Sequence, residues 1–295
     1  MLGGLGAILT LVTAVLFYFG WARSFAQARA MGIDVSLFGF SSQDYVLQSI
    51  NYLYVPLLVL LGLGLGWLWL HSRVVALLRS DLLAVPRRRE LVTSWAFWLT
   101  VAAGALAVGS VLFTVETGVP HPPAPVAGLM SRLQDSRWVV PAVLVAATLT
   151  ASYASWIYRS VRPPPAEPVA PLPLWQTLLP VALVAGTVVF GGFWALGEFA
   201  TAVGKGYAQN LANNVAGLPR AVVISPTPLG VEAPGVHEER VGGAGSPGVV
   251  YRTTGLRLLA RSGGKILLVH DGWNLSSGTV IVVADREDLS WQFSK

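Results

Sequence analysis

The chain has 295 residues, of which 54% are apolar and only 12% are charged. An average soluble domain is about 45–50% apolar and about 25% charged, so this composition argues against a large water-soluble globule and against a disordered chain. The absence of cysteine excludes disulfides and thiolate metal sites, and the net charge of +5 comes from scattered arginines rather than a stripe that would bind nucleic acid.

Five apolar segments are each long enough to cross a bilayer core about 30 Å thick, which takes about 20 helical residues. No charged residue lies in the middle of any segment, and Trp and Tyr gather near the ends, as they do at membrane interfaces. We therefore predict a membrane α-helical bundle with five transmembrane helices. The predicted spans are residues 2–21, 52–70, 91–115, 138–158 and 174–199.

Arginines in the loops predict the orientation of the chain. The loops after the second and fourth spans hold seven arginines together, whereas the loops after the first and third spans hold four. Because positively charged loops stay on the cytoplasmic side, we expect a multi-pass protein of the cell membrane with a cytoplasmic N-terminus and an outer C-terminus. Five arginines of the second loop are expected at the membrane surface, near anionic lipids: Arg73, Arg79, Arg87, Arg88 and Arg89.

The first apolar segment has a second interpretation as a cleaved signal sequence. Ala26-Gln27-Ala28 has the A-x-A pattern of a signal peptidase site. The segment is long for a signal sequence, no basic residue precedes it, and Arg23 lies just before the pattern, so a retained helix is favoured. Cleavage somewhere within residues 1–28 would leave four spans and the same sidedness.

Local patterns predict how the second helix begins and how the linking segments behave. Ser41 and Asp44 are spaced as in a capping box, so we expect a helix from Ser42 into the second span, kinked at Pro56. Residues 73–85 form either a short interfacial helix or an extension of the second span that ends at Pro86. The proline-rich segments 120–125 and 163–173 are expected to be a turn-rich loop and a stiff, extended connector.

The fifth helix is expected to leave the membrane as a helical stalk over residues 201–217. Glu198, Lys205 and Gln209 lie on one face of it, beside an apolar stripe that contains Phe199, Val203, Tyr207 and Leu211. One interpretation of Glu198 and Lys205 is an ion pair or two solvated charges near the span end. The other is that Glu198 of several copies forms an acidic ring at the outer mouth of a cation pore.

Residues 218–295 change to a strand-like pattern that predicts a small extracytoplasmic β domain. Strands are expected at 221–225, 249–260, 265–270, 279–284 and 289–293. Gly263-Gly264 predicts a hairpin turn, and a charged turn at 285–288 joins the last two strands. The domain is near the lower size at which a core suffices alone, so docking on the membrane domain or on neighbouring copies would stabilise it.

Small residues at helical spacing mark candidate packing positions in the spans. Gly62 and Gly66 form a GxxxG pair, and Ala105 and Gly109 repeat that spacing in the third span. The fifth span contains Gly191, Gly192 and Gly197, where the helix has room to bend. These contacts are expected within one bundle or between copies of a homo-oligomer.

No catalytic, nucleotide-binding or metal-binding motif is present, so no enzyme activity, metal or cofactor is expected. His237-Glu238-Glu239 is more typical of an exposed loop than of a metal site, which needs several convergent ligands. Residues 43–49 and 251–259 resemble segments of multi-pass membrane proteins of actinobacteria, as does the arginine-rich, lysine-poor composition. That family has no assigned activity, so the resemblance implies a source and supplies no site residues.

These features lead to two main functional hypotheses. In the first, a self-associating membrane protein uses its fifth helix to couple the β domain to the bundle, with an ion-conducting pore as one version. In the alternative, the β domain of a membrane-anchored binding or sensor module recognises an envelope component or a secreted protein. An intramembrane enzyme or transporter is favoured least, because the spans lack buried ionisable residues at mid-membrane.

Overall fold

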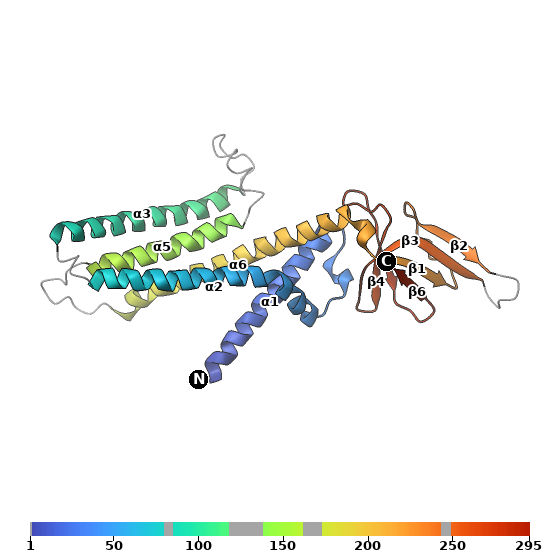
Figure 1. The fold of residues 1–295 in the computed structure, drawn as a ribbon, viewed down its shortest axis with the longest axis horizontal. Coiled ribbons are helices and arrows are strands. Elements are labelled where there is room, and N and C mark those ends of the chain that lie inside the picture. Colours follow the sequence, from blue (N-terminus) through green and yellow to red (C-terminus); the bar gives the residue numbers. More distant parts are fainter. Residues whose placement is uncertain (1, 80–84, 118–137, 162–172, 243–248) are drawn as a thin grey trace. The chain divides into compact units, whose positions relative to one another are not determined.

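The computed structural model describes residues 2–79, 85–117, 138–161, 173–242 and 249–295 (Figure 1). Its helices are α1 (Leu2–Ala30), α2 (Ser42–Arg79), α3 (Pro86–Thr117), α5 (Val139–Val161) and α6 (Leu174–Asn213), and an antiparallel sheet follows them. All five helices are long and apolar enough to cross a membrane, which confirms the predicted number. The proline-rich segments 120–125 and 163–172 lie outside the described residues.

The chain forms two compact units, and α2 and α6 each contribute to both. Unit 1 contains Met1–Asn51 and Ala200–Lys295, and unit 2 contains Tyr52–Phe199. The end of α1, the start of α2 and the end of α6 therefore belong to the same unit as the sheet.

In unit 2, α3 and α5 lie side by side and antiparallel (Figure 1). Each helix buries small or medium side chains seven residues apart: Ala96, Ala103 and Ser110 on α3, and Ala147, Ala154 and Val161 on α5. Seven residues are close to two helical turns, so each set forms one stripe along which the backbones approach. At the end of the pair, Arg89 Nε donates to the carbonyl oxygen of Val161 at 2.8 Å, where a cation complements the helix C-terminus.

The unit 2 part of α2 contacts α5 through aromatic side chains. His71 Nδ1 lies 3.1 Å from the hydroxyl of Tyr153, and the Trp67 ring meets the Tyr153 ring edge-on with centroids 4.5 Å apart. No residue of the most apolar part of Pro56–Arg79 is buried. The helix is continuous to Arg79, so residues 73–79 extend the second span instead of forming a separate interfacial helix.

Most of the predicted small-residue contacts are not formed within one chain. A Cβ atom added at Gly62, Gly66, Gly109 or Gly192 would have no neighbour within 4 Å among the described residues, and Ala105 is exposed. Gly191 does meet another helix, since its added Cβ would touch the Val145 side chain of α5. On α3, the stripe facing α5 runs through Ala103 and Ser110, a different side of the helix, so contact of Ala105 and Gly109 with another copy stays a prediction.

The predicted capping box at the start of α2 is confirmed. The backbone N–H and the hydroxyl of Ser41 both donate to Asp44 Oδ2 at 2.8 Å, and the N–H of Asp44 donates back to Ser41 Oγ at 3.3 Å. Helix α2 begins directly afterwards at Ser42 and continues through Pro56. The cap fixes where the connection after α1 turns into helix α2.

We expect the pKa of Asp44 to lie below the ordinary aspartate value. The backbone N–H of Ser41 contributes most to this lowering, followed by its hydroxyl, because both stabilise the carboxylate. A lowered folded-state pKa means that the cap stabilises the fold above the unfolded-state pKa and is lost as the pH falls through the folded value. A carbon-13 NMR titration of the carboxyl group measures it. Ser41→Ala should return the pKa part of the way, and an Asp44 pKa at or above the ordinary value would contradict the cap.

The sheet contains β1 (Arg220–Ser225), β2 (His237–Val241), β3 (Val250–Ser262), β4 (Lys265–His270), β5 (Val280–Ala284) and β6 (Ser290–Ser294). Its order is β5-β4-β3-β1-β6, and β2 pairs with the first half of β3.

In a flat sheet, β5 and β6 would lie about 19 Å apart. The chain between Ala284 and Ser290 can span about 20 Å only when it is fully extended. A turn from Arg286 to Leu289 makes this connection shorter than the separation of the two strands in a flat sheet. The sheet therefore curls, so that its two edges approach each other.

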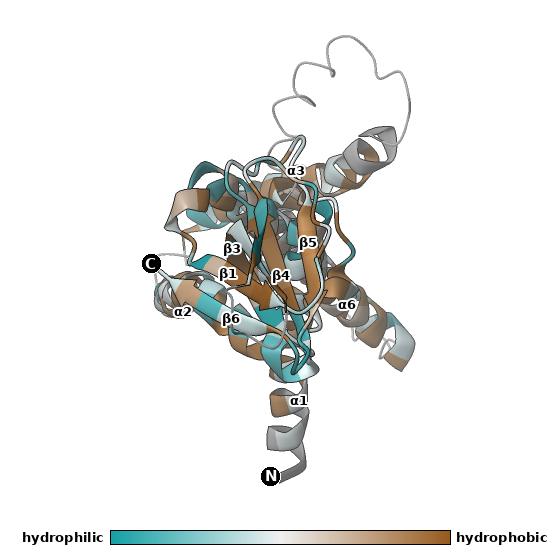
Figure 2. Ribbon diagram, turned by 90° about the vertical axis from the view of Figure 1, so that its right-hand side faces the viewer, coloured by the Kyte–Doolittle hydropathy of each residue, from teal (hydrophilic) through white to brown (hydrophobic). Residues whose placement is uncertain are grey.

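The curled sheet encloses one core and presents a second apolar face to the helices of unit 1. The inner core combines residues from β1, β3, β4 and the last turn: Ala221, Val223, Leu256, Ile266, Leu268 and Leu289. Leu267 and Val269 point to the opposite face, and β4 is hydrophobic along most of its length (Figure 2). A strand that is buried on both faces reads as a continuous apolar run, which is why Lys265–His270 lacks alternation.

The C-terminal antiparallel sheet was predicted, and two of its details differ from expectation. Gly263 and Gly264 form the β3–β4 turn, with φ of 56° and 70°, as the hairpin turn requires. The turn at 285–288 does connect the last two strands, but these are not neighbours, because β6 pairs with β1. The strand His237–Val241 lies in a segment predicted to be irregular.

Candidate functional site

Helices α1 and α6 cross at close range in unit 1. A Cβ atom at Gly204 would overlap the carbonyl oxygen of Arg23 and would lie 3.0 Å from the Cβ of Ala26. The buried stripe of α6 consists of Ala200, Gly204, Ala208 and Leu211. Its first three residues each follow a residue of the predicted apolar stripe by one position, and Leu211 belongs to both stripes. Tyr207 of the predicted stripe is 40% exposed. The shift follows from size, because only small residues allow the two backbones to meet.

The start of α2 packs against the same part of α1. A Cβ atom at Gly20 would overlap the carbonyl oxygen of Tyr45, so the two backbones touch there. The rings of Phe17 and Tyr45 meet edge-on with centroids 5.7 Å apart. The start of α2 and the end of α6 therefore both pack against residues 17–27 of α1.

Arg23 is the polar centre of this convergence. Its side chain is only 4% exposed, and it contacts both neighbouring helices. Nη1 donates to Gln48 Oε1 of α2 at 3.0 Å, and the guanidinium carbon lies 4.8 Å from the ring centroid of Tyr207 of α6. A buried cation is costly unless it is paired with polar or aromatic groups, so these contacts tie its burial to the arrangement of all three helices. The first span predicted from the sequence ends at Trp21, before Arg23, whereas α1 continues to Ala30.

The outer face of the sheet shares hydrophobic cores with these helix ends. One core joins the end of α1, the end of α6 and the sheet: Met31, Ala208, Leu211, Val215, Val269 and Trp273. A second core joins Ala28 of α1, Phe38 of the connection between α1 and α2, and Leu267 of β4. The sheet and the helix ends thus form one packed body rather than two domains joined by a flexible stalk.

Two polar side chains of the sheet, Arg257 and Ser262, hydrogen-bond to the segments that connect the helices of unit 1. Arg257 of β3 is 7% exposed, and its Nε donates to Asp271 Oδ1. Its Nη1 donates to the carbonyl oxygens of Ala216 and Leu218 at 2.7 and 2.8 Å, in the segment that joins α6 to β1. The hydroxyl of Ser262 donates to the carbonyl oxygen of Gly39 at 3.0 Å.

The predicted pore residues do not form a cluster with one another. Glu198 is half-buried, and Lys205 and Gln209 are exposed on the same helix. Among the described residues, the ion pairs link Arg257 to Asp271, Arg261 to Asp285 and Arg286 to Asp288, and none involves Glu198 or Lys205. Gly197 is half-buried in α6.

Glu238 and His270 contact the local backbone of the β domain. No group of three or more metal-ligating residues is found in the described part of the chain. Glu238 Oε1 accepts the N–H of Leu229 at 2.7 Å and the hydroxyl of Thr253 at 3.2 Å, so it holds the loop between β1 and β2 against β3. His270 is 3% exposed, and its Nδ1 lies 2.9 Å from the carbonyl oxygen of Asp271.

Comparisons with protein family models, with curated proteins and with solved structures found no match for this chain. The predicted kinship with actinobacterial membrane proteins therefore stays a prediction.

Proposed function

We propose that this protein is a membrane-anchored coupling module, in which the β domain and the ends of α1 and α6 move as one body. The observation that supports it is the shared core of Met31, Val269 and Trp273 with the last turns of α6. A displacement of the sheet would carry α1 and α6 with it, because close-packed interfaces shift as units. An envelope component or a secreted protein bound by the sheet is the input that such a module would sense.

In this proposal the N-terminus is cytoplasmic and the sheet lies outside the cell membrane. The arginine distribution supports this orientation, and the grouping of three helix ends with the sheet supports an odd number of crossings. The first helix is retained, because residues 17–28 hold the start of α2 and the end of α6 in place. Cleavage at Ala26-Gln27-Ala28 would remove those contacts.

The pore version of the proposal adds self-association, with Glu198 of several copies around an axis. It is supported by the continuity of α6 from Leu174 to Asn213 and by the half-buried position of Glu198. A protein that stays monomeric in a bilayer has no such axis, and the coupling function does not depend on one.

Trp273→Ala is expected to loosen the sheet and the helix ends together. Trp273 is 2% exposed in the shared core, and truncation of a buried Trp costs about 3–5 kcal/mol. Hydrogen exchange of the full chain in nanodiscs measures the effect. We expect amide protection to fall by about a hundredfold or more in residues 200–213 as well as in β4.

Trp291→Ala is the matched control, because Trp291 packs into the inner core of the sheet, away from the helices. It should lower the amide protection of β1 and β6 and leave residues 200–213 protected. If Trp273→Ala lowered the amide protection of the sheet but not that of residues 200–213, the sheet and the helices would not form one body, and the coupling function would be wrong.

A further inference from the structure

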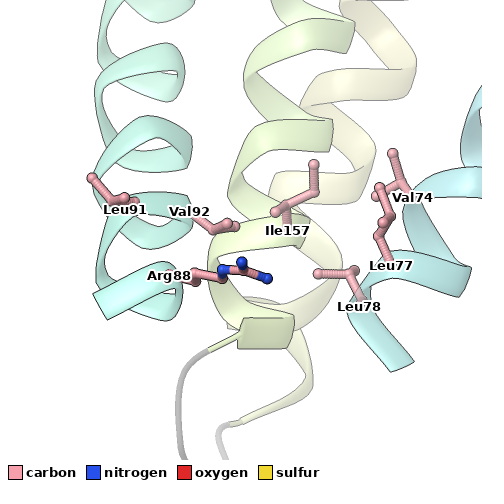
Figure 3. Close-up of a pocket in the computed structure, with 7 residues that line it drawn as sticks. All are labelled: Val74, Leu77, Leu78, Arg88, Leu91, Val92 and Ile157. Atoms are coloured by element: carbon pink, nitrogen blue, oxygen red, sulfur yellow. The ribbon is translucent and has the colours of Figure 1, made fainter. Parts of the chain in front are cut away.

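A pocket of about 400 Å³ lies in unit 2 between α2, α3 and α5 (Figure 3). Six aliphatic side chains and one guanidinium group line it: Val74, Leu77, Leu78, Arg88, Leu91, Val92 and Ile157. Its size falls within the range of about 300–1,000 Å³ that is typical of sites for small ligands. The lining describes a ligand that is mostly hydrocarbon and carries a negative charge at one end.

Arg88 is the polar group of this pocket. In Figure 3 its guanidinium group extends from α3 into the space between the helices, toward Leu78 and Ile157. The neighbouring Arg89 is engaged by the carbonyl oxygen of Val161. No ion pair between described residues includes Arg88, and an anion held in the pocket would lie beside its charge.

The surroundings of Arg88 also favour an anion. Helix α3 starts at Pro86, and its first turn contains no acidic residue but carries Arg87, Arg88 and Arg89. The N-terminus of a helix has a partial positive charge, so three cations there are unfavourable without a compensating negative group. Arg79 and Arg159 occupy the last turns of α2 and α5 and add to the positive charge around these helix ends.

We propose that this pocket binds an anionic phospholipid, whose phosphate contacts Arg88 and whose acyl chain lies along Leu78 and Ile157. A free phosphate would gain nothing from the aliphatic walls, and a lipid without a phosphate group would leave the guanidinium group without an anionic partner. The arginine-rich helix ends are predicted to face the cytoplasm, where anionic lipids are concentrated. The site is independent of the coupling proposed for unit 1.

Native mass spectrometry of the full chain, released from detergent with defined lipids, tests this site. Phosphatidylglycerol should be retained at least about tenfold more tightly than phosphatidylcholine with the same acyl chains, because the choline cation of the latter is repelled by the arginines at these helix ends. Arg88→Gln should weaken phosphatidylglycerol binding about tenfold, as expected for loss of a charged hydrogen bond. Arg87→Gln is the matched control: it removes the same charge from the adjacent residue, which is exposed like Arg88 but does not line the pocket, and should change binding less than about twofold.

Two further measurements separate a lipid from a simple anion. Inorganic phosphate at millimolar concentration should not displace the lipid, because the acyl chain supplies part of the binding. Ile157→Phe should fill part of the pocket and weaken lipid binding with Arg88 intact. Equal retention of the two lipids, equal effects of Arg88→Gln and Arg87→Gln, or displacement by phosphate would each overturn the proposal.

Discussion

Arg257→Met is expected to lower the free energy of unfolding of unit 1 by about 2–4 kcal/mol, the loss typical of removing one partner from a buried charged network. The substitution keeps the aliphatic length of the side chain but removes donors to Asp271, Ala216 and Leu218. The two carbonyl oxygens belong to the segment between α6 and β1, so its position on the sheet would no longer be fixed. Asp271 has a half-exposed side chain, which places the loss below that of a fully buried ion pair.

Arg261→Met is the matched control, because Arg261 lies on the same strand and also pairs with an aspartate. Its side chain is 58% exposed, and its contact with Asp285 is a surface ion pair worth at most about 1 kcal/mol. Amide hydrogen exchange in β3 and β4 of the full chain reports the free energy of opening for both variants. Similar losses for the two substitutions would show that Arg257 does not clamp the α6–β1 segment.

The contrast between these two arginines shows that the burial of a charged side chain in a strand could not be predicted from the sequence. Arg252, Arg257 and Arg261 occur in β3, of which residues 250–260 were predicted, and nothing in the sequence distinguishes the buried arginine. Burial of Arg257 depends on the end of α6 folding back over the sheet, which is a tertiary event. The hydrophobic pattern predicts the strand, and packing decides the role of its charges.

Features with a local cause were predictable. The five helices follow from apolar length, the start of α2 follows from Ser41 and Asp44, and the β3–β4 turn follows from Gly263-Gly264. In each case the residues that determine the structure are close together in the sequence. Strand β2 was missed because all five of its residues, His237–Val241, are exposed and show no apolar alternation. It forms only because β3 presents a free edge beside it.

The candidate site of unit 1 was missed for a related reason. The sequence predicts that Arg23 lies outside the membrane, because an arginine that follows an aromatic residue at the end of a span usually does. Its burial requires Gln48 and Tyr207, which come from helices distant in the sequence. The contacts of Gly20 and Gly204 could not be predicted either, because a glycine in a helix predicts weaker helicity and does not indicate which backbone will approach it.

Gly204→Leu is expected to separate α1 from α6, with a loss of about 3 kcal/mol or more in the stability of unit 1. Any side chain at this position overlaps the carbonyl oxygen of Arg23, and a backbone atom inside a helix cannot move away as the end of a flexible side chain can. The shared core below the crossing would open, because Ala208 and Leu211 follow on the same stripe of α6.

Gly206→Leu is the matched control for this crossing, because an added Cβ there meets no atom within 4 Å in the described structure. Replacing this glycine by leucine should leave stability unchanged or raise it by up to about 1 kcal/mol through helix propensity. The two leucine variants therefore have opposite expected signs, although they differ by two positions on one helix.

The lack of cysteine in the chain allows a direct readout of this separation. Ser24 of α1 is fully buried, so a nearly isosteric Ser24→Cys thiol should react slowly with a maleimide in otherwise unaltered protein. Gly204→Leu should raise the labelling rate by about a hundredfold, which corresponds to the expected loss of roughly 3 kcal/mol. Gly206→Leu should leave the rate unchanged. Slow labelling in the Gly204→Leu variant would mean that α1 and α6 do not cross at this glycine, and the coupling proposed for unit 1 would lose its closest contact.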